Sequence, residues 1–159
     1  MKHIISVIVD NKPGVLARVA GLFSRRAYNI DSLAVGPTET KDVSRITLVV
    51  HGNDDIVEQI SKQLNKLPDV KKVLDLTQGE CISREMVMIK VRATAKTRHD
   101  IYALARSFRA KVIDVAEESM VIEVTGATEK INGLEALLEK YGLLAVVRTG
   151  KIALSRGKK

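Results

Sequence analysis

The run from Asp10 to Leu16 (DNKPGVL) is the stretch of the sequence best suited to binding chemistry. It lies where a strand-like apolar run ends and an amphipathic run begins, so we expect a helix to start here. The first N–H groups of a helix lack partners and bind carboxylates or phosphates. Gly14 has no side chain to cover these groups, and Asn11 can cap the helix or accept from a ligand's ammonium. The segment could therefore hold both charged groups of an amino acid.

Two alternatives remain open at this point. Pro13 and Gly14 could merely shape a turn between a strand and a helix. Asn29, which follows the first helix together with Ile30, could end that helix as a C-cap, because asparagine tolerates the left-handed conformation. Asn29 could equally donate a hydrogen bond to a ligand that bridges two subunits.

No other group of residues predicts catalysis or metal binding. The single cysteine, Cys81, excludes an internal disulfide and is expected to be a free thiol. The carboxylate pairs Asp54-Asp55 and Glu117-Glu118 fit the first turn of a helix and a tight turn. The histidines are far apart and show no zinc-ligand spacing; they are His3, His51 and His99. We therefore expect no catalytic residue and no metal site.

Composition narrows the class of protein. The chain has 159 residues, a net charge of +7 and 3% aromatic residues. Proteins that bind single-stranded nucleic acids stack bases on aromatic side chains, so we expect no nucleic-acid partner. No apolar run approaches the ~20 residues that span a bilayer, and the N-terminus lacks the features of a signal peptide. Together with the lone cysteine, this favours a cytoplasmic protein.

The basic C-terminal run from Arg148 to Gly157 has apolar residues alternating within it. It could form an edge strand followed by a solvated tail, since lysine on an edge strand discourages unwanted pairing. It could also dock onto an acidic partner. The sequence leaves both open.

Apolar periodicity predicts the elements that position the Asp10–Leu16 run. Alternation and β-branched residues predict strands, whereas apolar residues three and four apart predict helices. In the first half we expect strands at 3–9, 30–36, 43–51 and 70–77, with helices at 13–26 and from Asn53 to Pro68. The order β-α-β-β-α-β gives a four-stranded antiparallel sheet with both helices on one face.

The second half repeats this order after a polar stretch at 78–84, which we expect to be a linker. Strands are predicted at 85–93, 110–116, 119–125 and 144–154. One helix begins at Thr97 and has an apolar stripe that reaches Phe108, and another is capped by Thr128 and terminated by Gly142. The fold class is therefore α+β, with two ferredoxin-like βαββαβ sandwiches in tandem. The predicted domains are residues 1–77 and 85–159.

Asp10–Leu16 resembles the ligand loop of ACT domains, which are small βαββαβ modules that usually bind amino acids between two copies. The resemblance extends over essentially the whole chain to the small, regulatory subunits of acetohydroxyacid synthase, also called acetolactate synthase. Its motifs are Asn11–Thr38, Gln59–Leu67, Phe108–Val115, Val124–Gly126 and Arg148–Leu154. Ala27-Tyr28 departs from the Gly-Phe expected there.

This resemblance implies a regulatory subunit that is not itself an enzyme. Its partner would be a catalytic large subunit that holds thiamine diphosphate, Mg²⁺ and FAD, so no cofactor is expected in this chain. The small subunit would activate that enzyme and confer feedback inhibition by valine or another branched-chain amino acid. The effector site carried over from the family consists of Asn11, Gly14, Val15 and Leu16 from one protomer and Asn29 and Ile30 from its mate, in a homodimer of ACT domains.

The main alternative is a stand-alone amino-acid sensor of the ACT type that has no enzyme partner. Such a sensor would use the same Asp10–Leu16 turn, so the sequence of the turn does not separate the two. Co-purification separates them, because a stand-alone sensor should be isolated without a second protein.

Overall fold

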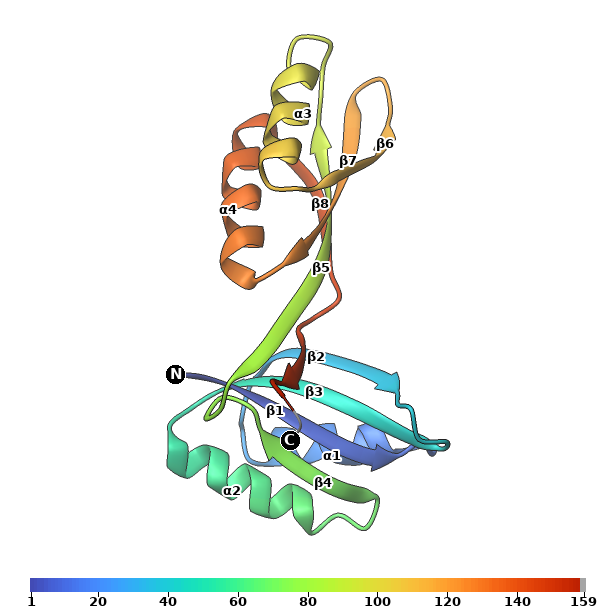
Figure 1. Ribbon diagram of the computed structural model, residues 1–159, viewed down its shortest axis with the longest axis vertical. Coiled ribbons are helices and arrows are strands. Elements are labelled where there is room, and N and C mark those ends of the chain that lie inside the picture. Colours follow the sequence, from blue (N-terminus) through green and yellow to red (C-terminus); the bar gives the residue numbers. More distant parts are fainter. Residues whose placement is uncertain (158–159) are drawn as a thin grey trace. The chain divides into compact units, whose positions relative to one another are not determined.

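The computed structural model describes residues 1–157. The chain forms two compact units, one of Met1–Ile82 together with the segment from Lys151 onward, and one of Ser83–Gly150 (Figure 1). Each unit has its own hydrophobic core. Within residues 1–157, no helix combines the length and the apolar character that a membrane span requires.

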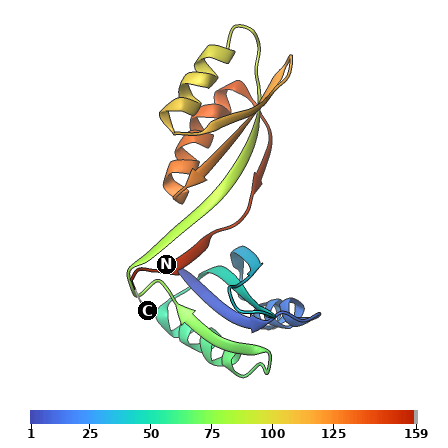
Figure 2. The same cartoon turned by 45° about the vertical axis from the view of Figure 1, so that its right-hand side comes forward.

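The first unit confirms the predicted β-α-β-β-α-β order. Its sheet is antiparallel, with the strand order β2-β3-β1-β4. Both helices cover one face of this sheet (Figures 1 and 2). The elements are β1 (Lys2–Asp10), α1 (Val15–Arg25), β2 (Ile30–Pro37), β3 (Val43–His51), α2 (Asp54–Asn65) and β4 (Val70–Asp75).

Alternation along β1 explains this packing. Ile5, Val7 and Val9 point toward the helices and are fully or almost fully buried. Helix α1 meets them with an apolar stripe that includes Phe23, and α2 begins at the cap Asn53, whose side chain accepts from the Ile56 N–H at 2.9 Å. An asparagine in this position satisfies one of the otherwise unpaired N–H groups of the first turn.

The start of the first helix lies two residues later than predicted. Pro13 is in the preceding turn, and the helix begins at Val15 after Gly14, whose φ of +86° lies in the left-handed region. A right-handed helix cannot include a residue with that φ, so Gly14 sets the boundary.

The second unit has the same topology, with the strand order β6-β7-β5-β8. Its core is built from alternate residues of β5 and the apolar stripes of two helices. Its elements are β5 (Cys81–Arg92), α3 (Arg98–Ser107), β6 (Lys111–Val115), β7 (Ser119–Gly126), α4 (Thr128–Leu138), the short 3₁₀ helix η1 (Glu139–Tyr141) and β8 (Leu143–Arg148).

The C-terminal strand differs from the prediction. The expected strand at 144–154 is divided into β8 and β9 (Ile152–Ser155), because Gly150 adopts a φ of +85° that an extended strand cannot contain. Strand β9 pairs with β5. From Lys151 onward the chain belongs to the first unit, where Ala153 is buried and the Arg156 N–H donates to the Glu80 carbonyl at 2.8 Å.

Two smaller expectations also change. The interval 78–84, expected to be a linker, contains the first residues of β5, because Cys81 and Ile82 already extend that strand. Helix α4 is preceded by Ala127 as its cap, so Thr128 is its first residue and gives no side-chain cap. The domain boundaries at 77 and 85 remain predictions.

Candidate functional site

The turn between β1 and α1 is held by its own backbone. The Asn11 N–H donates to the Asp42 carbonyl at 2.9 Å, and the Lys12 N–H donates to the Asp10 carbonyl at 3.0 Å. These bonds fix the entry to the helix, and the left-handed Gly14 then turns the chain into it. The helix start is therefore a defined surface before any ligand arrives.

The first turn of α1 presents N–H groups that the protein itself does not use. In the described part of the chain, no acceptor lies opposite the N–H groups of Gly14, Leu16 and Ala17. The Val15 N–H makes only a long contact of 3.4 Å with the Lys12 carbonyl. No side chain caps this helix. A carboxylate is the natural acceptor for such a group of amides.

Arg18 joins this surface and was not singled out from the sequence. A Cβ atom at Gly14 would lie 3.0 Å from Nη1 of Arg18, so the guanidinium stands directly over the glycine. Nε of Arg18 donates to Oδ2 of Asp69 at 2.9 Å, and Nη2 pairs with the same oxygen. Asp69 thus holds the arginine while Nη1 faces Gly14. The spacing could have revealed it, because residues four apart share one helix face.

The predicted site residues of the turn differ in their availability. Asn11, Gly14 and Leu16 are exposed, and the Leu16 side chain is an apolar surface at 43% exposure. Val15 is only 3% exposed and packs in the core. The Val15 side chain is therefore not available to a ligand in this chain, since a valine at the first helical position faces the sheet. Val15 can contribute only its backbone.

Asn29 and Ile30 lie at the other end of the sheet. Ile30 and His3 both pair with Val50, so Ile30 is level with the beginning of β1, eight residues before Asn11. At the rise of a strand this is roughly 25 Å. A single chain therefore does not bring the two predicted halves of the site together, and a second copy is needed to do so.

Asn29 does not cap the first helix. The cap residue is Arg26, and Ala27 rather than Asn29 takes the left-handed conformation, with a φ of +56°. The Asn29 side chain is exposed and its Nδ2 donates to Oδ1 of Asp31 at 3.2 Å. The expectation of a C-cap is wrong, and the amide stays accessible for a ligand.

The histidines and Cys81 are the remaining residues whose side chains commonly bind metals or act as nucleophiles. Residues 1–157 contain no group of three or more His, Cys, Asp or Glu side chains that could hold a metal ion. His3 is fully buried, with its ring nitrogens 3.7 Å from Asp54 and 3.5 Å from Asp75. Cys81 is a free, half-buried thiol. The turn before α1 remains the best candidate site.

Comparison with known proteins identifies both units. The model of the AHAS small subunit-like ACT domain matches residues 5–72, and the model of the small subunit of acetolactate synthase matches residues 84–157. The two matches together cover most of both compact units.

Similarity to individual proteins extends over the full length. The chain is 50% identical over 159 residues to a probable acetolactate synthase small subunit of Archaeoglobus fulgidus, covering 100% of this chain and 99% of that protein. It is 52% identical over 155 residues to the acetolactate synthase small subunit of Mycolicibacterium smegmatis, covering 98% and 91%. The crystal structure of the Thermotoga maritima small subunit superposes with a TM-score of 0.91 at 40% identity, covering 100% and 99%.

Proposed function

The chain belongs to the family of acetolactate synthase small subunits, and from this premise we propose that it binds the large subunit of that enzyme, activates it and makes it sensitive to valine. The family assignment confirms the expectation of a non-catalytic subunit in branched-chain amino acid biosynthesis. Thiamine diphosphate, Mg²⁺ and FAD are assigned to the large subunit, and the complex is assigned to the cytoplasm.

The effector site is assigned to the turn before α1. The valine carboxylate accepts from the unpaired N–H groups at Gly14 and Leu16 and lies beside Nη1 of Arg18. The ammonium donates to the side-chain oxygen of Asn11, and the isopropyl group packs on Leu16. This proposal rests on one observation. The backbone N–H groups around Gly14 have no acceptor, and they lie next to the Arg18 guanidinium, which is bonded to Asp69.

A partner protomer completes the site. Asn29 and Ile30 are too far from Gly14 in their own chain, so the residues that face the effector from the other side come from a second copy. Strand β2 lies at one edge of its sheet. A twofold axis beside that edge brings the beginning of one β2 near the end of the other. The end of β2 is level with the end of β1, where the effector turn starts, because Pro37 and Val9 both pair with Ser44. The proposed assembly is therefore a homodimer through the first units.

Inhibition requires only that valine bind one state of the complex better than another. A difference of about 1–3 kcal/mol between the two states is typical of allosteric coupling and corresponds to a roughly 5- to 150-fold difference in the affinity of valine for them. Such an effect fits a site made of a few amides and one shared arginine.

Gly14→Asp tests this proposal against Gly14→Ala. Both variants strain a residue at φ +86°, but only aspartate places a carboxylate beside the effector's own. We expect Gly14→Asp to weaken valine binding by at least about 30-fold, because a charged hydrogen bond is replaced by repulsion. We expect Gly14→Ala to weaken it much less. Calorimetric titration of valine, leucine and isoleucine into the purified chain measures both.

The same variants are assayed with the large subunit. Gly14→Asp should abolish valine inhibition while the activation of the enzyme is retained, because the substitution changes one exposed residue of the effector turn. Full valine sensitivity of Gly14→Asp would place the effector site elsewhere. Asn11→Ala should also reduce affinity, whereas Asn65→Ala, an exposed asparagine at the end of α2, serves as its matched control.

A further inference from the structure

We propose that residues Arg148–Lys151, the return segment, transmit effector binding in the first unit to the second unit. This inference rests on the proposed effector site and describes how binding at that site affects the second unit. The chain passes between the two units within β5 and again between Gly150 and Lys151. Residues on both sides of the second passage make hydrogen bonds: Lys151 bonds to β2 in the first unit, and Arg148 bonds to β5 and α4 in the second unit.

On the first-unit side, the return segment is bonded to the strand that carries the effector residues. The Lys151 N–H donates to Oγ of Ser32 at 2.9 Å. Ser32 lies on β2 two residues after Ile30. The register of β2 against β3 shifts between Ile30 and Ser32, so Asp31 is an irregular residue in the ladder. A bulge of this kind leaves the extra residue unpaired in the ladder and bends the strand locally.

The irregular residue is itself linked to Asn29. Oδ1 of Asp31 accepts from Nδ2 of Asn29 at 3.2 Å, and its carboxylate pairs with Lys2 at 3.4 Å. A ligand that recruits the Asn29 amide competes for this contact. Asp31 would then lose its hydrogen bond from Asn29, and it is the residue next to Ser32, which accepts from the Lys151 N–H.

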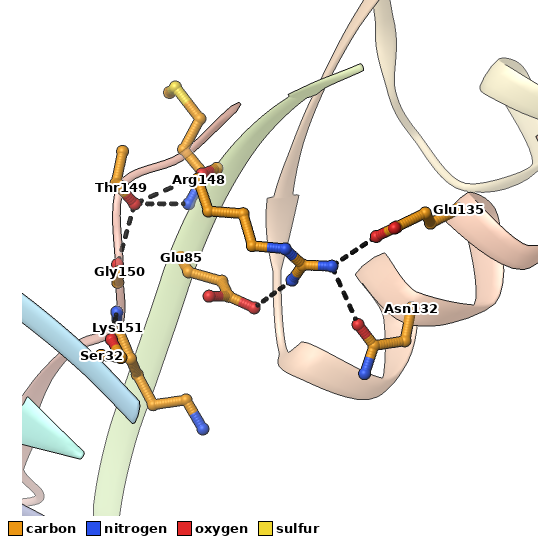
Figure 3. Close-up of polar contacts among 9 residues, drawn as sticks. Ser32, Glu85, Asn132, Glu135, Arg148, Thr149, Gly150 and Lys151 are labelled. Atoms are coloured by element: carbon orange, nitrogen blue, oxygen red, sulfur yellow. Dashed lines mark hydrogen bonds and ion pairs between the residues drawn. The ribbon is translucent and has the colours of Figure 1, made fainter. Parts of the chain in front are cut away.

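On the second-unit side, the return segment is firmly anchored (Figure 3). Nη1 of Arg148 donates to Oε1 of Glu85 at 3.2 Å, and Nη2 donates to Oδ1 of Asn132 at 3.1 Å and pairs with Glu135. Glu85 is almost fully buried at 7% exposure. This arginine therefore joins β8 to both β5 and α4.

Thr149 closes the same anchor. Its N–H donates to the Met86 carbonyl at 3.0 Å, and its Oγ1 accepts from the Met86 N–H at 3.1 Å. The threonine side chain thus continues the ladder with β5 by one more pair of bonds.

The bonded residues on the two sides, Thr149 and Lys151, are close together in the chain. Thr149 and Lys151 are separated by one residue, so their Cα atoms cannot lie more than about 7.3 Å apart. That residue is Gly150, whose φ of +85° a residue with a Cβ rarely adopts. A displacement of Lys151 is therefore absorbed by rotation at Gly150 or passed to the Arg148 anchor.

The test compares Ser32→Ala with Ser24→Ala. The first substitution removes the acceptor of the Lys151 N–H, whereas the Ser24 hydroxyl bonds only to the Ala20 carbonyl of its own helix. We expect both variants to bind valine within about twofold of the wild-type affinity by calorimetry. With the large subunit present, Ser32→Ala should raise the valine concentration for half-inhibition by at least about fivefold, and Ser24→Ala should not.

Hydrogen exchange of the full chain separates this proposal from the effector site itself. In the wild type, valine should protect amides around Asn11–Leu16 and also change exchange in β8 and α4. In Ser32→Ala only the first change should remain, and Gly150→Ala should alter the second change independently of Ser32.

The outcomes are distinct. Valine protection confined to the first unit of the wild-type chain would overturn the role of the return segment and leave the effector site standing. Absence of any valine-dependent protection would overturn both proposals. Unchanged inhibition in Ser32→Ala and in Gly150→Ala, with normal valine binding, would also refute transmission through the return segment.

Discussion

The turns that follow the first strand of each unit occupy the same place in the same topology, yet their backbone N–H groups have different hydrogen-bond partners. After β1, Gly14 is left-handed, and the N–H groups of Gly14, Leu16 and Ala17 have no acceptor in the described chain. After β5, Oγ1 of Thr97 accepts from the Thr94 N–H at 2.9 Å, and the Thr97 and Arg98 N–H groups donate to the Thr94 carbonyl. The Thr97 and Arg98 N–H groups therefore have acceptors, whereas those of His99 and Asp100 have none within residues 1–157, like those of Leu16 and Ala17.

The arginines beside the two turns differ in the same way. Arg18 is held by Asp69 with Nη1 facing Gly14, where a ligand's carboxylate would lie. Arg98 instead uses Nη2 to donate to the carbonyls of Ala116 and Glu117, at 3.0 and 2.7 Å. One cation is available to a ligand and the other closes a turn of its own unit.

Both units place a helix start at the end of the first strand, and both have an arginine there. The difference lies at the residue before each helix. The Gly14 N–H has no acceptor within residues 1–157, whereas the Thr97 N–H donates to the Thr94 carbonyl and Oγ1 of Thr97 accepts from the Thr94 N–H. A shared fold thus leaves the backbone of the two turns with different partners.

The largest predicted effect tests whether the two units are energetically separate. Arg148→Met removes the partner of the buried Glu85 carboxylate and the link to α4. We expect a loss of about 2 kcal/mol in the unfolding free energy of the second unit, at the lower end for a buried pair because Arg148 is one-third exposed. Hydrogen exchange under native conditions should show faster opening of β5, β8 and α4, with the core of the first unit unchanged.

Arg106→Met on the exposed side of α3 is the matched control and should change little. An equal loss of protection in the cores of both units after Arg148→Met would show that they unfold together. The comparison between two self-sufficient sandwiches would then fail.

The sequence predicts the topology well because alternation and helical periodicity record which residues face a core. Ile5, Val7 and Val9 read directly as one buried face of a strand. The sequence fails where a single backbone angle decides the structure. Gly150 reads as part of a continuous strand, yet its left-handed φ separates β8 from β9 and sends the chain to the first unit.

The candidate site shows the same limit. Asn11 and Gly14 were predictable from a strand-to-helix turn with a glycine. The position of Arg18 was not, because it depends on Asp69, which is far away in the sequence.

The second prediction concerns the hydrogen bond between Thr94 and Thr97 in the turn before α3. Thr97→Ala leaves the Thr94 N–H without its acceptor, so we expect the second unit to lose about 1 kcal/mol of unfolding free energy. Thr128→Ala is the matched control, because the buried Oγ1 of Thr128 has no hydrogen-bond partner and alanine suits the first turn of α4. Denaturant unfolding should show that control to be neutral or slightly stabilising. Equal losses in both variants would show that the Thr94–Thr97 bond does not distinguish this turn.

The smallest predicted effect concerns an ion pair on the surface of α2, which has no counterpart at the same spacing on the described helices of the second unit. Lys62 lies 2.7 Å from Glu58 one turn earlier on α2, and no such pair at this spacing occurs on α3 or α4 within residues 1–157. The hydrogen bond and the charge of Lys62 lower the pKa of Glu58 below its ordinary value. A carboxyl group whose pKa is lowered on folding stabilises the folded state above its ordinary pKa, and this contribution is lost as the pH falls through the folded value.

Lys62→Met should therefore raise the pKa of Glu58 toward its ordinary value, which NMR titration of the side-chain carboxyl measures. Lys66→Met, which removes a nearby lysine with no described contact to Glu58, should leave the titration in place. Because both side chains are exposed, the change in stability should be too small to move the unfolding midpoint noticeably. A large shift of that midpoint in Lys62→Met would mean that α2 depends on surface charge rather than on its buried stripe of Val57, Ile60 and Leu64.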